Sequence, residues 1–255
     1  MTPRRLEGTV AIVTGAAGAF GRAITHRLHS EGASVAAWDC NGDGVRQLAE
    51  TIGDAVLPLE VDITDSAAVD AAAQATRDAF GPITILVNNA GISRAGLPWE
   101  DSDESWAEMI SINASGSYWC VRAVLGDMRE QRYGKIVNIG SLAAQQGRPT
   151  TAPSYAASKG AVLGMTVSLA RNLGEFGICV NAINPGFIRT EIHDQFTDEE
   201  IARLAADIPV HRRGRRGEHG VPDDIAAAVA YLVSPDSDFV SGEFLSVNGG
   251  SRTGS

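Results

Sequence analysis

The sequence is poor in the features that mark disulfide-rich, zinc-binding and membrane-spanning proteins. It has three cysteines in 255 residues, Cys40, Cys120 and Cys179, and none of them lies in a CxxC pair. This pattern excludes a disulfide framework and a cysteine-based zinc site, so we expect no metal and a reducing, cytoplasmic location. The short, polar start of the chain does not have the pattern of a signal peptide, and no apolar run reaches membrane-spanning length.

Positive charge is also scarce. The chain has 21 lysines and arginines against 31 aspartates and glutamates, which gives a formal net charge of −10. A chain with this balance has no general attraction for nucleic acid or for an anionic membrane, and we expect neither as a partner. One basic run, from His211 to His219, departs from this trend. We interpret it as a solvated loop, and the alternatives are contact with another subunit, with an acidic substrate group or with nucleic acid.

The sequence does contain short apolar runs that alternate with longer segments of helical period. We expect strands at residues 10–14, 34–38, 56–61, 83–87, 135–139, 178–183 and 244–247. We expect helices at about residues 20–30, 44–52, 65–80 (with Asp65 as the N-cap), 104–130, 154–174 and 223–232. Apolar strands that are each followed by a helix predict a parallel sheet covered on both faces. No break in composition divides the chain. The prediction is one α/β domain, residues 1–255, with a doubly wound, mostly parallel sheet.

The residues that follow each strand are the candidate functional site, because ligands of such sheets bind outside the carboxyl ends of the strands. The first strand is followed by three glycines, Gly15, Gly18 and Gly21, which open a helix. Glycine permits a tight turn and a close backbone approach, and the start of the helix offers free N–H groups to a pyrophosphate. The glycines therefore predict a dinucleotide site, although an ordinary glycine-rich surface turn is the alternative.

Two aspartates follow the next two strands. Asp39 can hydrogen-bond both ribose hydroxyls of an adenosine and would repel a 2′-phosphate. No arginine or lysine lies at residues 16–20 or 40–44 to receive such a phosphate, so we expect NAD rather than NADP. Without the glycines, Asp39 would be interpreted as an exposed residue that caps a turn. Asp62 either bonds the adenine amino group or caps the next turn, and the sequence leaves both open.

Tyr155 and Lys159 lie four residues apart in a segment of helical period, so their side chains stand on one face, about one turn apart. A phenol titrates near pH 10 in water, about three units above the pH at which an acid–base catalyst works best. A fixed ammonium beside the phenol lowers that pKa. Ser141, after the fifth strand, would bond a substrate oxygen if it lies near Tyr155. Tyr-x-x-x-Lys alone is a weak signal, and its weight comes from the other motifs.

Together these segments resemble the short-chain dehydrogenase/reductase family, from about Thr9 to Gly250. The matching motifs are the glycine-rich turn from Thr14 to Gly21, Asn88-Asn89-Ala90-Gly91, Asn113, Ser141, Tyr155-x-x-x-Lys159, Pro185-Gly186 and Thr190. The resemblance implies a Rossmann fold with a seven-stranded sheet, NAD as the cofactor, and an alcohol or ketone as the substrate. One departure is Asn248, which stands where the family usually has aspartate in Val-Asp-Gly-Gly, and we expect a structural effect at most.

The resemblance also implies a role for each matching residue. Tyr155 would be the acid/base, Ser141 would hold the substrate oxygen, and Lys159 would bond the nicotinamide ribose and tune Tyr155. Asn113 would hold a water that links Lys159 to solvent. The full set of residues implied to bind the cofactor is Gly15, Gly18, Ala19, Phe20, Gly21, Asp39, Asp62, Ile63, Asn89, Ala90, Gly91, Tyr155, Lys159, Pro185, Gly186, Ile188 and Thr190.

Three functions remain in competition. The first is an NAD(H)-dependent oxidoreductase that transfers a hydride between nicotinamide and a secondary alcohol or ketone. The second is an NADPH-dependent 3-oxoacyl-thioester reductase, which Asp39 disfavours. The third is a dinucleotide-binding sensor or scaffold without catalysis, which the joint presence of Ser141, Tyr155 and Lys159 disfavours. The family also suggests a homotetramer that uses the helices at 113–130 and 154–174, and a substrate lid at about 187–220. Candidate contacts to a polar substrate are Arg94, Gln145, Arg148 and His193.

Overall fold

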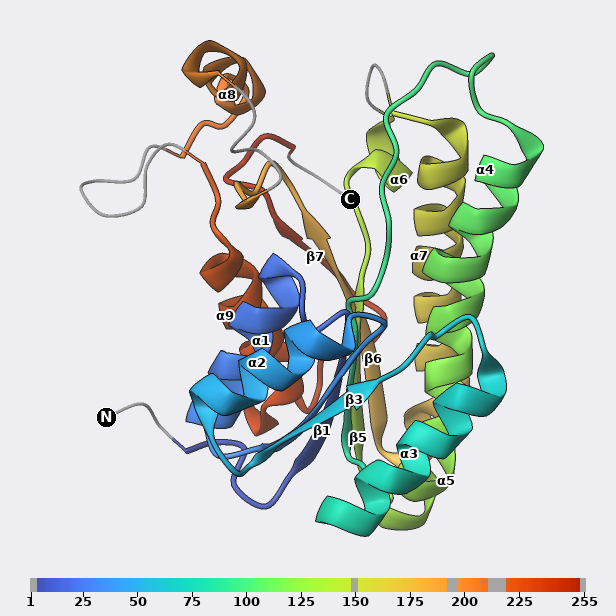
Figure 1. Ribbon diagram of the computed structural model, residues 1–255, viewed down its shortest axis with the longest axis vertical. Helices are drawn as coiled ribbons and strands as arrows, with labels where there is room; N and C mark the ends of the chain where they lie inside the picture. Colours follow the sequence, from blue (N-terminus) through green and yellow to red (C-terminus); the bar gives the residue numbers. More distant parts are fainter. Residues whose placement is uncertain (1–3, 148–150, 192–196, 211–218, 253–255) are drawn as a thin grey trace.

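A single parallel sheet runs through the centre of the molecule (Figure 1). The computed structural model describes residues 4–147, 151–191, 197–210 and 219–252. The strands are β1 (Val10–Thr14), β2 (Ser34–Asp39), β3 (Val56–Glu60), β4 (Ile85–Asn88), β5 (Gly134–Ile139), β6 (Ile178–Pro185) and β7 (Phe244–Val247). Their order is β3-β2-β1-β4-β5-β6-β7, and all six neighbouring pairs are parallel. The strand order reverses between β1 and β4, which makes this the point where a ligand is expected.

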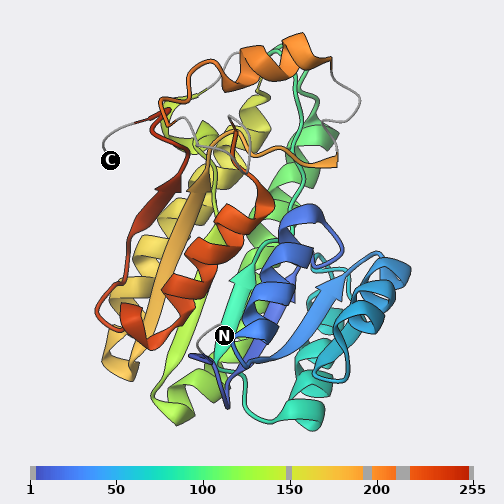
Figure 2. The same ribbon diagram turned by 90° about the vertical axis from the view of Figure 1, so that its left-hand side faces the viewer.

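Helices cover both faces of the sheet, as the sequence predicted. One face carries α1 (Ala19–Ser30), α2 (Gly42–Ile52) and α9 (Pro222–Val233), and Figure 2 shows α1 beside α9. The other carries α3 (Ser66–Phe80), α5 (Ser117–Gln131) and α7 (Pro153–Leu173). Shorter helices lie above the strand ends or join elements: α4 (Asp103–Met109), α6 (Ala143–Gln146), α8 (Asp198–Ala205) and the 3₁₀ turns Gly174–Phe176 and Pro235–Ser237. None of the helices that the structure describes is long and apolar enough to cross a bilayer.

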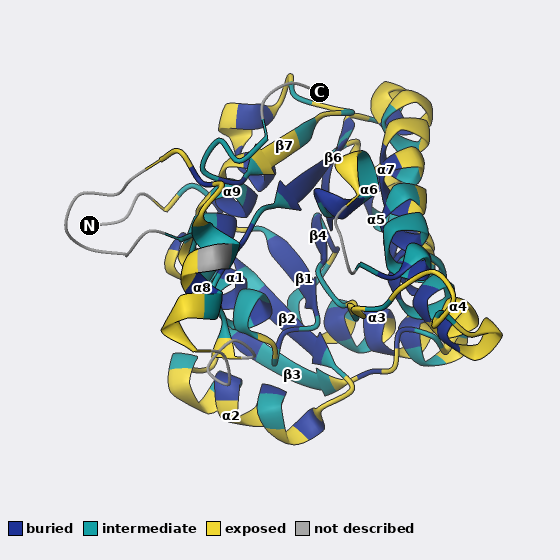
Figure 3. Ribbon diagram, turned by 90° about the horizontal axis from the view of Figure 1, so that it is seen from above, coloured by how far each residue is buried: buried dark blue, intermediate teal, exposed yellow. Residues whose placement is uncertain are grey.

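The core has two halves because successive strand residues point to opposite faces. In β1, Ala11 and Val13 pack with α1, α2 and α9, whereas Val10 and Ile12 pack with α3 and α5. All five residues of β1 are buried. Seen from above, the buried strands lie between helices whose outer surfaces are exposed (Figure 3). The doubly wound α/β prediction is confirmed, and the short, uninterrupted apolar runs of the sequence are explained by strands buried on both sides.

The structure departs from the predicted elements in two places that bear on the site. The predicted helix at 104–130 is not continuous: α4 and α5 are joined by a π-helical segment, η1 (Ile110–Gly116), with Asn113 near its middle. Periodicity could not reveal this, because a π-helical turn changes the helical phase only locally, and such turns are frequent at functional sites. The fourth strand begins at Ile85 rather than at Ile83. The N-cap prediction was right: Asp65 Oδ1 accepts hydrogen bonds from the backbone N–H groups of Ala67 and Ala68.

Candidate active site

The three glycines in the turn after β1 differ in the space around them and in their backbone conformation. Gly15 has φ +65°, and a Cβ there would lie 2.7 Å from the Ala90 Cα. A Cβ at Gly21 would collide with the carbonyl oxygen of Gly15. Gly18 is different, because a Cβ would meet only the Gly15 oxygen, at 3.4 Å. Packing therefore requires Gly15 and Gly21, whereas Gly18 leaves open space at the first turn of α1, where N–H groups have no acceptor in the helix. That open space fits a pyrophosphate.

The spacing of these glycines departs from the Thr-Gly-x-x-x-Gly-x-Gly pattern of the resembled family. Counted along the chain, Gly15, Gly18 and Gly21 are three residues apart. Gly15 and Gly21 take the outer glycine positions of the pattern, and Ala19 stands at the middle one. Ala19 is the first residue of α1, so its backbone is helical and a methyl group is accepted there. Gly18, the residue before it, supplies the open approach.

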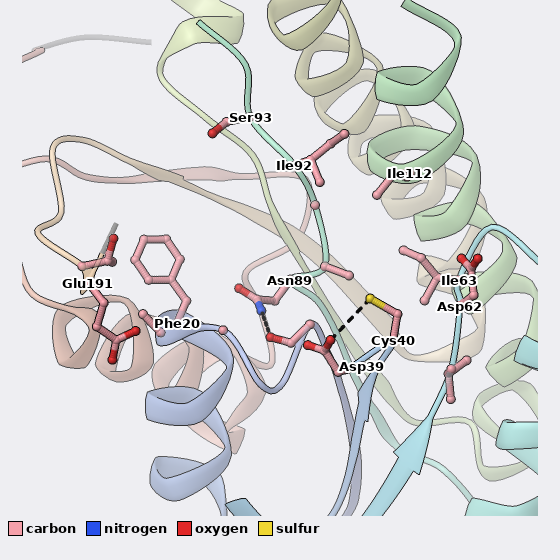
Figure 4. A pocket seen from close by; sticks show the side chains of 17 residues that line it. Phe20, Asp39, Cys40, Asp62, Ile63, Asn89, Ile92, Ser93, Ile112 and Glu191 are labelled. Atoms are coloured by element: carbon pink, nitrogen blue, oxygen red, sulfur yellow. Dashed lines mark hydrogen bonds between the residues drawn. The ribbon is translucent and has the colours of Figure 1, made fainter. Parts of the chain in front are cut away.

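Side chains from the end of β2 and from the residue that follows β4 hold this turn in place. The backbone N–H of Ala17 donates to Asp39 Oδ2 at 3.0 Å. The Asn89 side-chain amide donates to the carbonyl oxygens of Thr14 and Gly15, at 2.9 and 3.0 Å. Figure 4 shows Asp39 and Asn89 beside the turn. Asp39 is thus oriented by the turn, and it lies at the wall of a cavity.

That cavity has a volume of about 520 Å³ and lies over the carboxyl ends of β1, β2 and β4 (Figure 4). The predicted cofactor residues that line it are Gly15, Gly18, Ala19, Phe20, Asp39, Asp62, Ile63, Asn89, Ala90, Gly91 and Thr190. Asp62 lines it and also caps the next turn, since its Oδ1 accepts from the Thr64 N–H and hydroxyl at 2.9 and 2.7 Å. Gly21 lines neither this cavity nor the adjoining one, because it packs against the backbone of Gly15 and Ala16. We call this cavity the dinucleotide pocket.

A second cavity, of about 570 Å³, adjoins the first, and we call it the substrate pocket. Ser141, Tyr155, Lys159, Pro185, Gly186 and Ile188 line it. Six residues line both cavities: Phe20, Asn89, Gly91, Ile92, Ser93 and Thr190. The two cavities are therefore continuous, and a dinucleotide held in the first would extend one end into the second. The chain thus brings Ser141, Tyr155 and Lys159 together at the place where that end would lie.

Lys159 is the charged group at the base of the substrate pocket. Its side chain is buried in α7, and its ammonium donates to the carbonyl oxygen of Ile139, at the end of β5, at 2.8 Å. Burial lowers the pKa of Lys159 to about 8, because the charged form loses hydration. A Cβ on Gly91 would lie 3.3 Å from its Nζ, so the loop after β4 passes directly beside it. The Ile139 carbonyl and the Gly91 backbone thus confine the ammonium, one helical turn from Tyr155.

Asn113 lies behind the pockets and lines neither of them. Its side chain is fully buried, its Oδ1 accepts from the Ile92 N–H at 2.9 Å, and its Nδ2 donates to the Ile92 carbonyl at 3.0 Å. The same Nδ2 donates to Ser158 Oγ at 2.9 Å. The side-chain amide therefore joins the β4–α4 segment to α7, and a role in holding a water stays a prediction.

The predicted substrate contacts fall into two groups. Gln145 is bonded within the protein, because its Oε1 accepts from Asn184 Nδ2 at 3.0 Å and from Arg252. Arg94 forms an ion pair with Glu108 at 2.8 Å. Arg148, His193 and most of the basic run, residues 211–218, lie outside the described residues. Residues that the sequence did not single out also line the substrate pocket, among them Ile92, Ser93, Ala95, Leu142 and Thr151. They are ordinary loop residues without a motif.

Comparison with known proteins agrees with this arrangement. Residues 15–252 match a family model described as Enoyl-(Acyl carrier protein) reductase. The chain belongs to the short-chain dehydrogenase/reductase family. It is 37% identical over 245 residues to a 3-oxoacyl-(acyl-carrier-protein) reductase of Vibrio cholerae, covering 96% of this chain and 98% of that one. It is 39% identical over 248 residues to a hydroxy(phenyl)methylsuccinyl-CoA dehydrogenase subunit of Thauera aromatica, covering 96% and 97%.

A solved short-chain dehydrogenase/reductase extends the comparison to three dimensions. The crystal structure of a 3-ketoacyl-(acyl-carrier-protein) reductase from Brucella melitensis, complexed with NADH, matches with a TM-score of 0.89. It is 34% identical in sequence, and the match covers 97% of this chain and all of that one. The resemblance drawn from the motifs and the Rossmann fold is thereby confirmed. The chain is an oxidoreductase of this family that uses a nucleotide cofactor. The names of the Vibrio and Thauera relatives refer to an acyl-carrier-protein substrate and a CoA substrate.

Proposed function

We propose that this short-chain dehydrogenase/reductase reduces the 3-oxo group of an acyl thioester to a 3-hydroxyl group, with NADH as the reductant. Two observations together support the proposal. The chain is similar over almost its full length to 3-oxoacyl-(acyl-carrier-protein) reductases, and its substrate pocket is lined by Ser141, Tyr155 and Lys159. It favours the second of the sequence-based hypotheses over the first, a simple alcohol dehydrogenase. The Thauera relative, named for a CoA thioester, supports the same substrate class.

The cofactor part of that second hypothesis is not adopted, because the dinucleotide pocket favours NADH over NADPH. Asp39 lines the pocket at the end of β2, and its carboxylate is fixed by the N–H of Ala17. A 2′-phosphate beside this carboxylate would be repelled. No lysine or arginine is among the described residues that line this pocket. The NADH in the Brucella structure is consistent with the same choice.

The chemistry follows from the residues around the substrate pocket. The bound nicotinamide would supply a hydride to the carbonyl carbon. Tyr155 would donate its phenolic proton to the carbonyl oxygen as negative charge develops there, and Ser141 would donate a hydrogen bond to the same oxygen. Ser141 Oγ is itself oriented by the Ala143 N–H, which donates to it at 3.1 Å. The Lys159 ammonium favours the phenolate left behind. One ketone, one hydride and one proton give one alcohol.

Three further predictions belong to this proposal. A homotetramer would use the faces of α5 and α7, where Tyr118 and Val167 are 45% and 44% exposed, and Trp106 on α4 is 47% exposed. Light scattering of the purified protein tests it, and a monomer would contradict it. The substrate lid would be the segment after β6, of which Phe187, Ile188 and Thr190 line the substrate pocket. A single domain and a cytoplasmic location stay predictions from the sequence.

The test is a substrate comparison on the full-length protein. Acetoacetyl-CoA, a 3-oxoacyl thioester on an acyl carrier protein and an N-acetylcysteamine 3-oxoacyl thioester are each assayed with NADH and with NADPH. Simple secondary alcohols, polyols and ketones without a thioester form the comparison set. We expect the thioesters to be turned over with the higher kcat/KM, and NADH to be preferred. Faster turnover of simple ketones would overturn the substrate class, and a strong preference for NADPH would overturn the cofactor.

A further inference from the structure

The helix that carries Tyr155 and Lys159 has no side-chain cap of its own. α7 begins at Pro153, and the residue at its N-cap position, Ala152, cannot accept a hydrogen bond through its side chain. The N–H groups of a first helical turn have no acceptor within the helix, and a polar side chain at the N-cap usually accepts one of them. Here that first turn includes Ser154, which is fully buried. Its N–H therefore needs an acceptor from another part of the chain.

Asp101 supplies that acceptor. Its Oδ2 accepts from the Ser154 backbone N–H at 2.7 Å, and its Oδ1 accepts from the Ser154 hydroxyl at 2.8 Å. Asp101 lies 53 residues earlier in the chain, in the segment between β4 and α4. The bond from the Ser154 N–H is the main reason that the pKa of Asp101 lies below its ordinary value. A charged carboxylate at this end of α7 also complements the helix dipole.

A second bond holds the same helix one turn later. Ser158 is fully buried, and its Oγ accepts from Asn113 Nδ2 at 2.9 Å. Ser154 and Ser158 are four residues apart, so they lie on one face of α7, about 6 Å apart along its axis. Each stands directly before one of the two functional residues, Tyr155 and Lys159. Two anchors a turn apart fix the rotation of the helix about its axis, and thereby the direction in which those two side chains leave it.

The segment that ends at Asp101 begins in the dinucleotide pocket. Its first residues line that pocket, as far as Ser93. Its middle pairs with the strand-like entry to α7: Ala95 forms an antiparallel bridge with Thr151, and the Ala152 N–H donates to the Arg94 carbonyl at 3.2 Å. One continuous segment therefore runs from the dinucleotide pocket to the start of α7, and Asp101 is the residue that ties its far end to the helix.

We propose that Asp101 is a positioning residue that orients Tyr155 by capping α7 at Ser154. Asp101 lines neither the dinucleotide pocket nor the substrate pocket, so its effect on the reaction is exerted through the helix. The inference rests on the acid/base role given to Tyr155 in the proposed function. Its consequence is that removing the carboxylate lowers turnover without lowering the affinity for NADH.

The test compares four variants of the full chain. Asp101→Ala removes both bonds, Asp101→Asn keeps one oxygen acceptor, and Ser154→Ala keeps the backbone bond. Asp103→Ala is the matched control, because it removes the same charge from an exposed residue two positions along. We expect kcat per bound NADH to fall about ten- to a hundredfold in Asp101→Ala, since small misplacements of a reacting group cost rates of this order. Asp101→Asn should fall less, Ser154→Ala less again, and Asp103→Ala should match the wild type. The Kd for NADH should stay within about twofold in all four.

A second readout does not depend on the substrate. The chain has four tyrosines, so tyrosine labelled with ¹³C at Cζ gives four signals, and Tyr155→Phe identifies the one from Tyr155. In Asp101→Ala that signal should shift or broaden, and in Asp103→Ala it should not. If the wild type reduces no thioester but the Tyr155 signal still changes in Asp101→Ala, the result contradicts the proposed function and leaves the positioning role supported. An unchanged Tyr155 signal and unchanged kcat in Asp101→Asn, or in Asp101→Ala if it folds, would overturn the positioning role.

Discussion

The two pockets of this enzyme are built in different ways. In the dinucleotide pocket the polar groups are fixed by bonds to neighbouring loops: Asp39 to the N–H of Ala17, and Asn89 to the carbonyls of Thr14 and Gly15. In the substrate pocket, Lys159 and Tyr155 come from α7, a helix whose orientation depends on bonds from a distant segment. The first pocket is set locally, and the second is set through the placement of one helix.

This difference predicts which changes should affect cofactor binding and which should affect turnover. A change in the locally fixed pocket alters what the dinucleotide contacts, and so it should appear in Kd and in cofactor preference. A change at an anchor of α7, such as Asp101, leaves the residues that line the dinucleotide pocket in place and should appear mainly in kcat. Residues that line both pockets, such as Gly91, should affect both quantities. Variants that fail to follow this division would break the comparison.

The largest effect is expected on the substrate side, from Tyr155→Phe. The variant keeps the ring and removes the proton donor, so kcat should fall by roughly 10²–10⁴-fold, the range of general acid–base catalysis. NADH titration by fluorescence should give an unchanged Kd, because the dinucleotide pocket is untouched. Tyr118→Phe is the control, since Tyr118 is 45% exposed on α5 and lines neither pocket. Undiminished turnover in Tyr155→Phe would remove the acid/base assignment.

The next effect belongs to the dinucleotide side, from Asp39→Ala. The variant loses the hydrogen bonds to the ribose and the repulsion of a 2′-phosphate. Hydrogen bonds to charged groups contribute about 1.5–3 kcal/mol, so the preference for NADH over NADPH should fall by roughly 10- to 100-fold. At saturating cofactor, kcat should change little. Asp43→Ala, at an exposed position of α2, is the control. An unchanged cofactor preference would show that Asp39 only supports the turn through Ala17.

Gly91→Ala tests the boundary between the pockets. A Cβ there would lie 2.9 Å from Asn113 Oδ1 and 3.3 Å from Lys159 Nζ. Asn113 cannot yield freely, because that oxygen accepts the Ile92 N–H. We expect the Kd for NADH to rise and kcat to fall, each by roughly tenfold, equivalent to about 1.4 kcal/mol. Gly96→Ala is the matched control, since a Cβ there meets nothing nearer than 3.9 Å. An effect on only one quantity would contradict a shared boundary.

The same division explains what the sequence could predict. The strands, the Asp65 cap, the position of Asp39 and the i, i+4 relation of Tyr155 and Lys159 all follow from local patterns, and the structure bears out their placement. The dinucleotide pocket is formed mostly by residues at strand ends, which is why the sequence located most of its lining.

The features that the sequence did not predict depend on contacts between segments that are far apart in the chain. Asp101 precedes its partner Ser154 by 53 residues, and no local pattern joins them. The π-helical segment that brings Asn113 against Ile92 has the same periodicity signal as an ordinary helix. Gln145, a candidate substrate contact in the sequence, accepts a hydrogen bond from the side chain of Asn184. The sequence therefore identified Ser141, Tyr155 and Lys159, which line one pocket, but it did not predict how α7 is held.

A smaller effect is expected from pH. Burial lowers the pKa of Lys159 to about 8, so the ammonium is present below that pH and is lost as pH rises through it. Reduction also needs Tyr155 to be protonated, so kcat should fall by a few-fold between about pH 8 and pH 9. The chain has two lysines, Lys135 and Lys159, so lysine labelled with ¹³C at Cε gives two side-chain signals. The Lys159 signal, identified in Lys159→Met, should titrate near pH 8; a midpoint near 10 would contradict the effect of burial.

The smallest effect is expected from Asn248→Asp, which restores the residue usual in the family. Asn248 Oδ1 accepts from the Gly250 N–H at 2.8 Å, and Nδ2 donates to the Arg252 carbonyl at 3.1 Å. Aspartate keeps the first bond and loses the second, so we expect a loss of about 1 kcal/mol and a fall in Tm of roughly 2–4 °C. Because Asn248 lines neither the dinucleotide pocket nor the substrate pocket, kcat and the Kd for NADH should stay unchanged. Asn172→Asp, at an exposed position of α7, is the control for the charge change. A large fall in kcat would mean that the segment after β7 acts on Gly186, whose backbone it contacts, and that the substrate pocket depends on a second distant anchor besides Asp101.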